Sequence, residues 1–336
     1  MLEPTEGDAM TQAPLVHVEN LSVRFPVGQT GLFRDNRKLV HAVENVSFDI
    51  APGETLGLVG ESGSGKSTTG RAILGSAPMT SGKVVFDGKE ISSSSKSEIR
   101  EMRRQMQLVF QDPYSSLNPR MTVGEIVAEP LVVHGLAKST ESARDAVVAI
   151  LEQCGMPADS IDRFPYAFSG GQRQRVGIAR ALSLRPKFII ADEPVSALDV
   201  SVRAQIVNLL KDLQIEMGVS YLFIAHDLSV VRHVSHKIGI MYSGSLVEYA
   251  PVDAVYTRPI HPYTEALLSS VPVPDPVIQR SRIRIPLTGE IPNPMSPPSG
   301  CRFHTRCPLA EARCRVETPQ LEEKSPGHFS ACFIKS

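Results

Sequence analysis

The chain lacks a long apolar run. Among its 336 residues, no stretch approaches the roughly 18 uninterrupted apolar residues that a transmembrane helix needs, so we expect no segment to span a bilayer. The first ten residues, MLEPTEGDAM, are acidic and contain no apolar signal core, so we expect no export. Both absences predict a cytosolic protein, whose thiols stay reduced.

An excess of charge of either sign is also missing. Lys and Arg total 35 and Asp and Glu total 36, which gives a net charge of −1. A protein that follows nucleic-acid phosphates usually carries a basic excess, so we expect no nucleic-acid partner. The length predicts about two domains, and 42% hydrophobic residues is ordinary for a globular chain.

Cysteine is scarce and unevenly placed. Four of the five cysteines lie within the last 36 residues, at Cys301, Cys307, Cys314 and Cys332. Their spacing has no tight C-x2–4-C pair, so zinc is an alternative that we do not favour. Disulfides are disfavoured in the cytosol, and ordinary packing is a further alternative. Cys154 stands alone in LEQCG, where we expect a plain packing residue.

These four cysteines sit in a segment that is unlike the rest of the chain. Residues 251–336 hold 14 of the 26 prolines, and we expect them to form a separate C-terminal appendage with little regular structure. A bound metal would supply such a segment with folding energy, and four thiolates match the ligand set of a [4Fe–4S] cluster. From the residues alone, such a cluster in a structural or sensing role stands beside zinc and ordinary packing as an interpretation.

Hydrophobic periodicity predicts the fold of the first 250 residues. Residues 14–90 alternate apolar and polar positions between turns, as short β-strands do. The runs TLGLVG, KFIIADE and YLFIAHD are continuously apolar, as strands buried on both faces are. A helix with one apolar face at 202–217 separates the last two, which predicts a parallel α/β sheet. From about 98 to 168 the pattern is helical.

The segment GESGSGKST fits G-x-x-x-x-G-K-[ST], between a predicted strand and a plausible helix. Backbone N–H groups of such a loop surround phosphate oxygens, and the helix dipole adds to the attraction. Lys66 is expected to reach the β- and γ-phosphates of ATP, and Ser67 to bind Mg²⁺. The expected ATP-binding residues are Gly60, Glu61, Ser62, Gly63, Ser64, Gly65, Lys66, Ser67 and Thr68. A chance Gly/Ser loop is the alternative, and the strand and lysine disfavour it.

The segment FIIADE supplies the matching acidic pair. Asp192 ends a predicted strand, where its carboxylate can hold Mg²⁺, and Glu193 can orient or deprotonate a water for in-line attack. An acidic pair after a strand is more often solvated surface. Beside a P-loop, the pair indicates a nucleoside triphosphatase.

The segment FSGGQRQRVGIARAL (168–182) resembles the signature motif of ATP-binding-cassette (ABC) ATPases, and further landmarks follow in family order. Gln111 in VFQDP resembles the Q-loop glutamine, which also contacts Mg²⁺. Asp199 in SALD resembles the D-loop aspartate, and His226 in IAHD the switch histidine. Phe25 in LSVRF occupies the place of an aromatic residue that stacks on adenine.

This resemblance covers residues 15–250 and implies an α/β P-loop NTPase fold. It implies an N-terminal antiparallel β-subdomain and a helical subdomain at about 112–170. Glu193, His226 and Gln111 would be the catalytic residues. The signature residues Ser169, Gly170, Gly171 and Gln172 lie too far along the chain to reach their own P-loop phosphates. The family resolves this with a head-to-tail dimer, in which each signature motif closes on the partner's ATP.

Three segments extend the resemblance to the ATPase subunits of bacterial oligopeptide and dipeptide importers: FQDPYSSLNPRMTVGEIVAEPL, DEPVSALDVSVRAQIVNLL and RPIHPYTEALLSSVPVPDP. It then covers essentially the whole chain, including the cysteine-rich tail, which in that family looks like a site for a [4Fe–4S] cluster. It implies a peripheral subunit on the cytoplasmic face of the inner membrane. The implied partners are a second, different ATPase subunit, two permease subunits and an extracytoplasmic binding protein.

Other functions remain as alternatives. The same machinery serves importers of nickel, glutathione, opines and some sugars. A soluble cassette ATPase that acts outside transport would typically show two cassettes or a strongly basic face, and this chain has neither. A simple P-loop kinase would have no use for the signature motif. We therefore expect an ATPase that powers peptide import.

Overall fold

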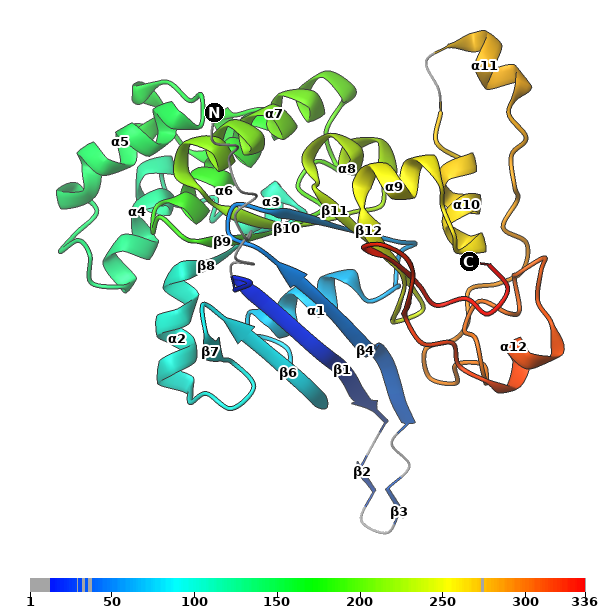
Figure 1. Ribbon diagram of the computed structural model, residues 1–336. Helices are drawn as coiled ribbons and strands as arrows, with labels where there is room; N and C mark the ends of the chain where they lie inside the picture. Colours follow the sequence, from blue (N-terminus) through cyan, green and yellow to red (C-terminus); the bar gives the residue numbers. More distant parts are fainter. Residues whose placement is uncertain (1–12, 29, 32–33, 36–37, 273–274, 336) are drawn as a thin grey trace, which may run out of the picture.

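The computed structural model describes residues 13–28, 30–31, 34–35, 38–272 and 275–335. The acidic first ten residues, on which the export expectation rests, lie outside the described residues. Figure 1 shows a small sheet at the front, a larger sheet behind it, and helices around the larger sheet. The α/β class predicted from the sequence is confirmed.

The small sheet is antiparallel and has the order β4-β1-β6-β7 within the described residues. Its strands are β1 (Val16–Val27), β4 (Lys38–Ile50), β6 (Ser81–Phe86) and β7 (Lys89–Glu90). Between β1 and β4 lie the two-residue strands β2 (Thr30–Gly31) and β3 (Arg34–Asp35). One face of this sheet packs on a core that it shares with the larger sheet. The predicted N-terminal antiparallel β-subdomain is therefore confirmed.

The larger sheet has the order β13-β14-β12-β11-β5-β10-β9-β8 within the described residues. Its parallel strands are β11 (Lys237–Tyr242), β5 (Thr55–Val59), β10 (Ser220–Ala225), β9 (Phe188–Asp192) and β8 (Met106–Val109). Every residue of β5, β9 and β10 is buried, as the continuous apolar runs predict. The four residues of β8 directly follow a helix, and the sequence pattern did not predict this strand.

The helices and 3-10 turns lie between the strands along the chain. In chain order they are α1 (Lys66–Ile73), α2 (Lys96–Gln105), α3 (Pro113–Ser116), α4 (Val123–Val133), η1 (Glu141–Ala143), α5 (Arg144–Gln153), η2 (Ala158–Asp162), η3 (Pro165–Ala167), α6 (Gly170–Leu182), α7 (Val200–Met217), α8 (Leu228–Val234), α9 (Val252–Thr257), α10 (Pro262–Ser269), α11 (Pro276–Ser281) and α12 (Ala312–Val316).

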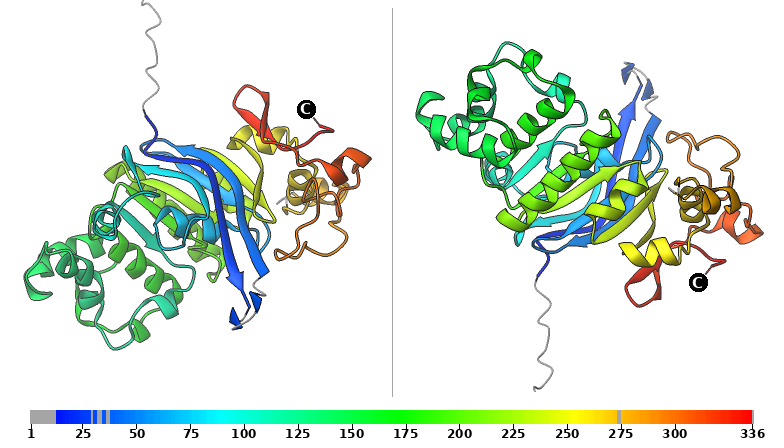
Figure 2. Two further views of the ribbon diagram at one scale, coloured as in Figure 1. Left: turned by 90° about the horizontal axis from the view of Figure 1, so that it is seen from below. Right: turned by 90° about the horizontal axis from the view of Figure 1, so that it is seen from above.

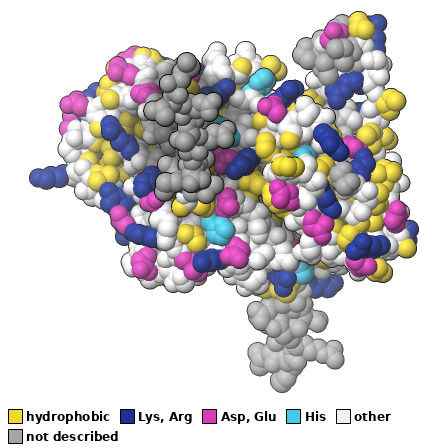
Figure 3. All heavy atoms as spheres, viewed as in Figure 1, with side chains coloured by type: hydrophobic (Ala, Val, Ile, Leu, Met, Phe, Trp, Pro, Cys, Tyr) yellow, Lys and Arg dark blue, Asp and Glu magenta, His cyan; other side chains and the backbone are white. Residues whose placement is uncertain are grey.

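The helices α4 and α5 and the C-terminal region lie at opposite ends of the molecule (Figures 1 and 2). In the part of the chain that the structure describes, every helix is too short or too polar to span a bilayer. On the face drawn in Figure 3, basic and acidic side chains are interspersed, as the near-zero net charge predicts.

The C-terminal region is irregular over residues 282–311, which contain neither helix nor strand. It nevertheless packs against the main fold, and the predicted start of a separate C-terminal region at residue 251 stays a prediction. After β12 (Ser245–Pro251), the later strands β14 (His328–Ser330) and β13 (Glu322–Ser325) extend the larger sheet. Tyr263 and Phe303 are fully buried in the main core. Long-range packing of this kind has no local periodicity from which it could be predicted.

A buried carboxylate ties the C-terminal region to β12. The Glu248 side chain is 0% exposed, and its oxygens accept hydrogen bonds from the backbone N–H groups of Ile260 and His261, each at 2.8 Å. Nε2 of His328 lies 2.7 Å from Glu248 Oε1. A buried carboxylate is costly unless such partners surround it, so both neighbouring segments are held against this strand.

Candidate nucleotide-binding site

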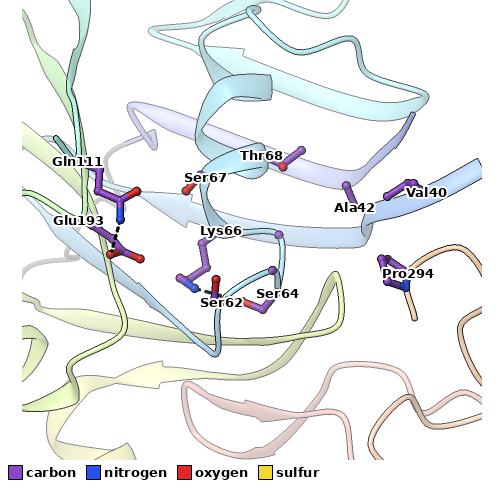
Figure 4. Close-up of a pocket in the computed structure, with 12 residues that line it drawn as sticks. Val40, Ala42, Ser62, Ser64, Lys66, Ser67, Thr68, Gln111, Glu193 and Pro294 are labelled. Atoms are coloured by element: carbon purple, nitrogen blue, oxygen red, sulfur yellow. Dashed lines mark hydrogen bonds between the residues drawn. The ribbon is translucent and has the colours of Figure 1, made fainter. Parts of the chain in front are cut away.

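A pocket opens where β5 ends and α1 begins, and it contains most of the predicted P-loop (Figure 4). Its lining residues are Val40, Ala42, Ser62, Gly63, Ser64, Gly65, Lys66, Ser67, Thr68, Gln111, Glu193 and Pro294. The structure therefore brings together seven P-loop residues with Gln111 and Glu193, as the motifs predict. Gly60 and Glu61 lie outside the lining, and Val40, Ala42 and Pro294 are residues that sequence reasoning missed.

Two glycines allow the P-loop to approach the neighbouring backbone closely. Gly65 has φ of 102°, and a Cβ there would lie 2.3 Å from the Ala42 carbonyl oxygen. At Gly60 a Cβ would lie 2.1 Å from the carbonyl oxygen of Met241. Both distances are shorter than any real contact, so these positions require glycine. The close approach leaves the backbone of the loop free to face a phosphate.

Lys66 begins α1 and turns its amine into the loop. Its Nζ donates hydrogen bonds to the carbonyl oxygens of Gly60 at 2.8 Å and Glu61 at 2.9 Å. Burial lowers the pKa of Lys66, while the nearby carboxylates of Glu193, Asp192 and Glu61 act in the opposite direction. The attraction of these carboxylates for the ammonium offsets part of the cost of burying it.

Ser67 and Asp192 meet although 125 residues separate them in the chain. Ser67 Oγ donates to Asp192 Oδ1 at 2.7 Å. Burial raises the pKa of Asp192, and the hydrogen bond from Ser67 partly offsets this effect. A hydroxyl and a carboxylate oxygen are the hard ligands that Mg²⁺ prefers. The pair fits the predicted magnesium site on its donor chemistry.

Glu193 lies at the centre of the predicted catalytic residues. Gln111 Nε2 donates to Glu193 Oε2 at 3.0 Å, and Nδ1 of His226 lies 3.2 Å from the same oxygen. The three residues follow the parallel strands β8, β9 and β10, whose carboxyl ends meet at one edge of the sheet. In this arrangement the Gln111 side chain pairs with Glu193, while the expected contact of Gln111 with Mg²⁺ stays a prediction.

The backbone of Glu193 is held in an unusual conformation. Its φ is +47°, which costs a non-glycine residue on the order of 1 kcal/mol. The Glu193 N–H donates to the Ile224 carbonyl oxygen at 2.9 Å, and this bond anchors the strained residue to β10. The strain turns the carboxylate toward the pocket, where its side chain is 16% exposed.

The signature motif caps a helix away from this pocket. Ser169 is the N-cap of α6, and its N–H donates to Gln172 Oε1 at 3.0 Å in a capping box. A Cβ at Gly171 would lie 2.3 Å from Val202 Cγ1, so α6 packs closely on α7. Within the part of the chain that the structure describes, residues 169–172 do not line the P-loop pocket. This placement agrees with the expectation that the motif serves another site.

Two further predicted residues also lie outside the pocket. Asp199 is the N-cap of α7 and accepts a hydrogen bond from the Val202 N–H at 2.9 Å, which lowers the pKa of Asp199. Phe25 in β1 pairs with Val40 and packs partly against the core of the small sheet. Val40 rather than Phe25 contributes to the pocket wall. The roles of Asp199 and Phe25 stay predictions.

The four tail cysteines come near one another. Cys314 and Cys332 are buried, and Cys301 and Cys307 are partly exposed. Burial raises the pKa of Cys301 to about 11, and the other three thiols add to this rise. The Cys301 N–H donates to the Cys314 carbonyl oxygen at 2.9 Å. Cys154 is fully buried in the main core, as expected of a packing residue.

This proximity does not amount to a metal site in the structure. Among the described residues, which include all five cysteines, no group of three or more His, Cys, Asp or Glu side chains is arranged to hold a metal ion. The metal-binding prediction therefore has no support from this geometry, while the nucleotide site is well formed.

Comparisons with known proteins agree with the nucleotide site. The family model described as "ABC transporter" matches residues 43–196, and the one described as "Oligopeptide/dipeptide transporter, C-terminal region" matches residues 247–314. The chain is 51% identical to the "Probable peptide ABC transporter ATP-binding protein y4tS" of Sinorhizobium fredii, over 96% of this chain and 90% of that protein. It is 47% identical to the "Oligopeptide transport ATP-binding protein AppF" of Bacillus subtilis, over 98% and 99% respectively.

Solved structures give the same picture for the fold. The dimeric ATP-binding cassette MJ0796 bound to ADP and Pi superposes with a TM-score of 0.62 at 31% identity, covering 70% of this chain and 98% of that one. The protein cbiO1 from Clostridium perfringens superposes with a TM-score of 0.62 at 26% identity, covering 73% and 91%.

Proposed function

Because this chain belongs to the ATP-binding subunits of ABC transporters, and hydrolyses ATP as such subunits do, we propose that it powers the import of peptides through a separate membrane permease. The observation that carries the ATPase part is the arrangement of Glu193 between Gln111 and His226 at the edge of the P-loop pocket. The peptide part rests on the relatives, two of which are named as peptide or oligopeptide transport ATP-binding proteins.

Each part of the pocket has a distinct chemical task. The backbone N–H groups of residues 62–68 surround the phosphates, and the Lys66 ammonium neutralises the β- and γ-oxygens. Ser67 and Asp192 would hold Mg²⁺, and the ion would supply charge stabilisation at the transferring phosphoryl group. Glu193 orients the attacking water and accepts its proton. Gln111 and His226 hold the Glu193 carboxylate and respond to the γ-phosphate.

The signature motif supports a paired arrangement. The N–H groups at the start of α6 form an anion site that lies outside the pocket of its own chain. We propose that residues 169–172 close on the ATP of a second ATPase subunit, a different chain in this family, and that the partner's signature closes on this one. Two permease subunits and an extracytoplasmic binding protein would complete the machinery at the cytoplasmic face of the membrane.

The proposed function predicts activity that depends on assembly. The purified subunit alone should hydrolyse ATP only weakly, because each site lacks a signature motif from the partner. Reconstitution with the second ATPase subunit, the permeases and the peptide-loaded binding protein should raise the rate. We would measure phosphate release in proteoliposomes, with the binding protein emptied of peptide as the control. A peptide-independent rate in the full assembly would contradict peptide import, and strong activity by a strict monomer would contradict the pairing.

The four tail cysteines remain the proposed ligands of a [4Fe–4S] cluster. In such a cluster each cysteine binds a different iron, so the four sulfurs lie farther apart than the ligands of a single ion. The positions of two of these cysteines are consistent with the proposal, because the Cys301 N–H donates to the Cys314 carbonyl oxygen at 2.9 Å and so brings the two residues together. When bound, the cluster would stabilise the irregular segment at 282–311.

Anaerobic purification tests this assignment. The protein should be brown, with about four irons per chain, and Cys307→Ser should lose the colour and the iron. Cys154→Ser should keep both, because that thiol lies in the main core. Iron content and the visible absorption spectrum measure the outcome. Colourless protein with stoichiometric zinc would overturn the cluster, and the ATPase assignment would stand.

A further inference from the structure

The side chain of Glu61, the second residue of the P-loop motif, points away from the pocket and into the C-terminal region. Arg306 Nη1 donates to Glu61 Oε2 at 2.7 Å, and Nη2 donates to Oε1 at 3.2 Å. This is the two-pronged geometry in which arginine binds a carboxylate most strongly. The Arg306 side chain is only 5% exposed and that of Glu61 is 26% exposed, so water screens the pair weakly.

The backbone of Glu61 is held from the same side. Its N–H donates to the phenol oxygen of Tyr263 at 3.0 Å. The Tyr263 ring packs against Tyr242 and Phe303, with centroids 4.7 and 5.4 Å away. Phe303 accepts, through its carbonyl oxygen, the N–H of Arg306 at 2.9 Å. One compact cluster therefore supplies the partners of both the N–H group and the carboxylate of Glu61.

The remaining polar group of Glu61 serves the nucleotide site. Its carbonyl oxygen accepts the hydrogen bond from Lys66 Nζ at 2.9 Å. The Glu61 carboxylate also attracts the Lys66 charge. Glu61 thus connects the C-terminal region, through its N–H and carboxylate, to the lysine that faces the phosphates.

A second contact brings the same region to the pocket. Pro294 lies beside Val40 and Ala42 on the pocket wall (Figure 4). Its carbonyl oxygen accepts the His41 N–H at 2.9 Å. The irregular segment at 282–311 therefore touches the pocket directly, on the side opposite the catalytic Glu193.

We propose that Arg306 is a positioning residue for ATP binding, which acts by neutralising and holding the Glu61 carboxylate. Without Arg306, that carboxylate would compete with the phosphates for the Lys66 ammonium, and its charge would repel a triphosphate. The C-terminal region would then be a working part of the nucleotide site as well as an addition to the fold. This inference rests on the proposed role of the P-loop as the ATP site.

Arg306→Met should weaken ATP binding by about fivefold to tenfold, because an unpaired negative charge then lies beside the P-loop. The double variant Glu61→Gln/Arg306→Met should return to near the native affinity, since the repelling charge is gone. Arg306→Lys should also stay close to native, because it keeps the positive charge. Arg258→Met is the matched control, an exposed arginine of the same region. We would titrate the full-length chain with ATP and Mg²⁺ and record the Tm of each variant.

A purely structural Arg306 would behave differently, because the double variant would then bind ATP as poorly as Arg306→Met. That result, or native affinity in Arg306→Met, would overturn the proposal. If Arg306→Met does not fold, the comparison of Arg306→Lys with the double variant still decides, since both should bind ATP at close to native affinity. Lys66→Ala tests the P-loop as the ATP site separately from the role of Arg306. If Lys66→Ala keeps its ATP affinity, the P-loop is not the ATP site. If Lys66→Ala loses ATP affinity while Arg306→Met binds ATP like the native chain, only the role of Arg306 is refuted.

Discussion

Glu193→Gln is expected to abolish ATP turnover and to leave ATP binding intact. The amide keeps the size of the side chain and can still accept a hydrogen bond from Gln111, but it cannot take a proton from water. General-base catalysis typically contributes about 10²- to 10⁴-fold, and the turnover of the assembled transporter should fall by that factor. Because hydrolysis no longer opens the pair, the variant should accumulate a dimer with ATP trapped at its interface.

Phosphate release and size-exclusion chromatography with ATP and Mg²⁺ measure these two effects. Glu152→Gln is the matched control, since Glu152 is an exposed residue of α5, and it should have the native rate. Near-native turnover by Glu193→Gln in the full assembly would remove Glu193 from the catalytic role.

Lys66→Ala is expected to weaken ATP binding more than it affects any other property of the chain. The ammonium is the cation held at the floor of the pocket by the Gly60 and Glu61 carbonyl oxygens. A hydrogen bond to a charged group contributes about 1.5 to 3 kcal/mol, so the Kd for ATP should rise roughly 10- to 150-fold. The effect should be smaller for ADP, which lacks the γ-phosphate.

Isothermal titration of the full-length chain with each nucleotide measures this loss. The exposed Lys211 of α7 offers the control Lys211→Ala, which should bind ATP like the native chain. An unchanged affinity in Lys66→Ala would mean that the phosphates bind elsewhere.

The local parts of the site were predictable from the sequence. The P-loop is contiguous, and its glycines and lysine occur at fixed offsets that the backbone geometry at Gly65 explains. Ser67 and Asp192 are far apart in the chain, yet their meeting was also predictable. Asp192 ends the buried strand β9, and Ser67 lies in the first turn of α1, which follows the buried strand β5 through the P-loop. The carboxyl ends of such parallel strands gather at one edge of the sheet.

The long-range parts of the site were not predictable. Arg306 and Glu61 are 245 residues apart, and Arg306 lies in a segment without helix or strand. No periodicity in the sequence predicts which residue of such a segment lies against the P-loop. The position of Pro294 at the pocket was unpredictable for the same reason. The strand β13 was missed because its sequence, EEKS, is polar throughout and has no apolar alternation.

The pairing of β14 with β12 also means that β12 is synthesised well before its partner strand. His328 and Glu248 are 80 residues apart in the chain, a stretch that a ribosome takes roughly 4 to 16 s to translate at about 5 to 20 residues per second. During that interval the nascent chain already holds the finished P-loop, but the edge of β12 has no neighbouring strand and Glu248 has no imidazole beside it. An open strand edge readily pairs with another chain. Each newly made copy is therefore most prone to aggregate after its ATP site has been translated and before residues 328–330 have emerged.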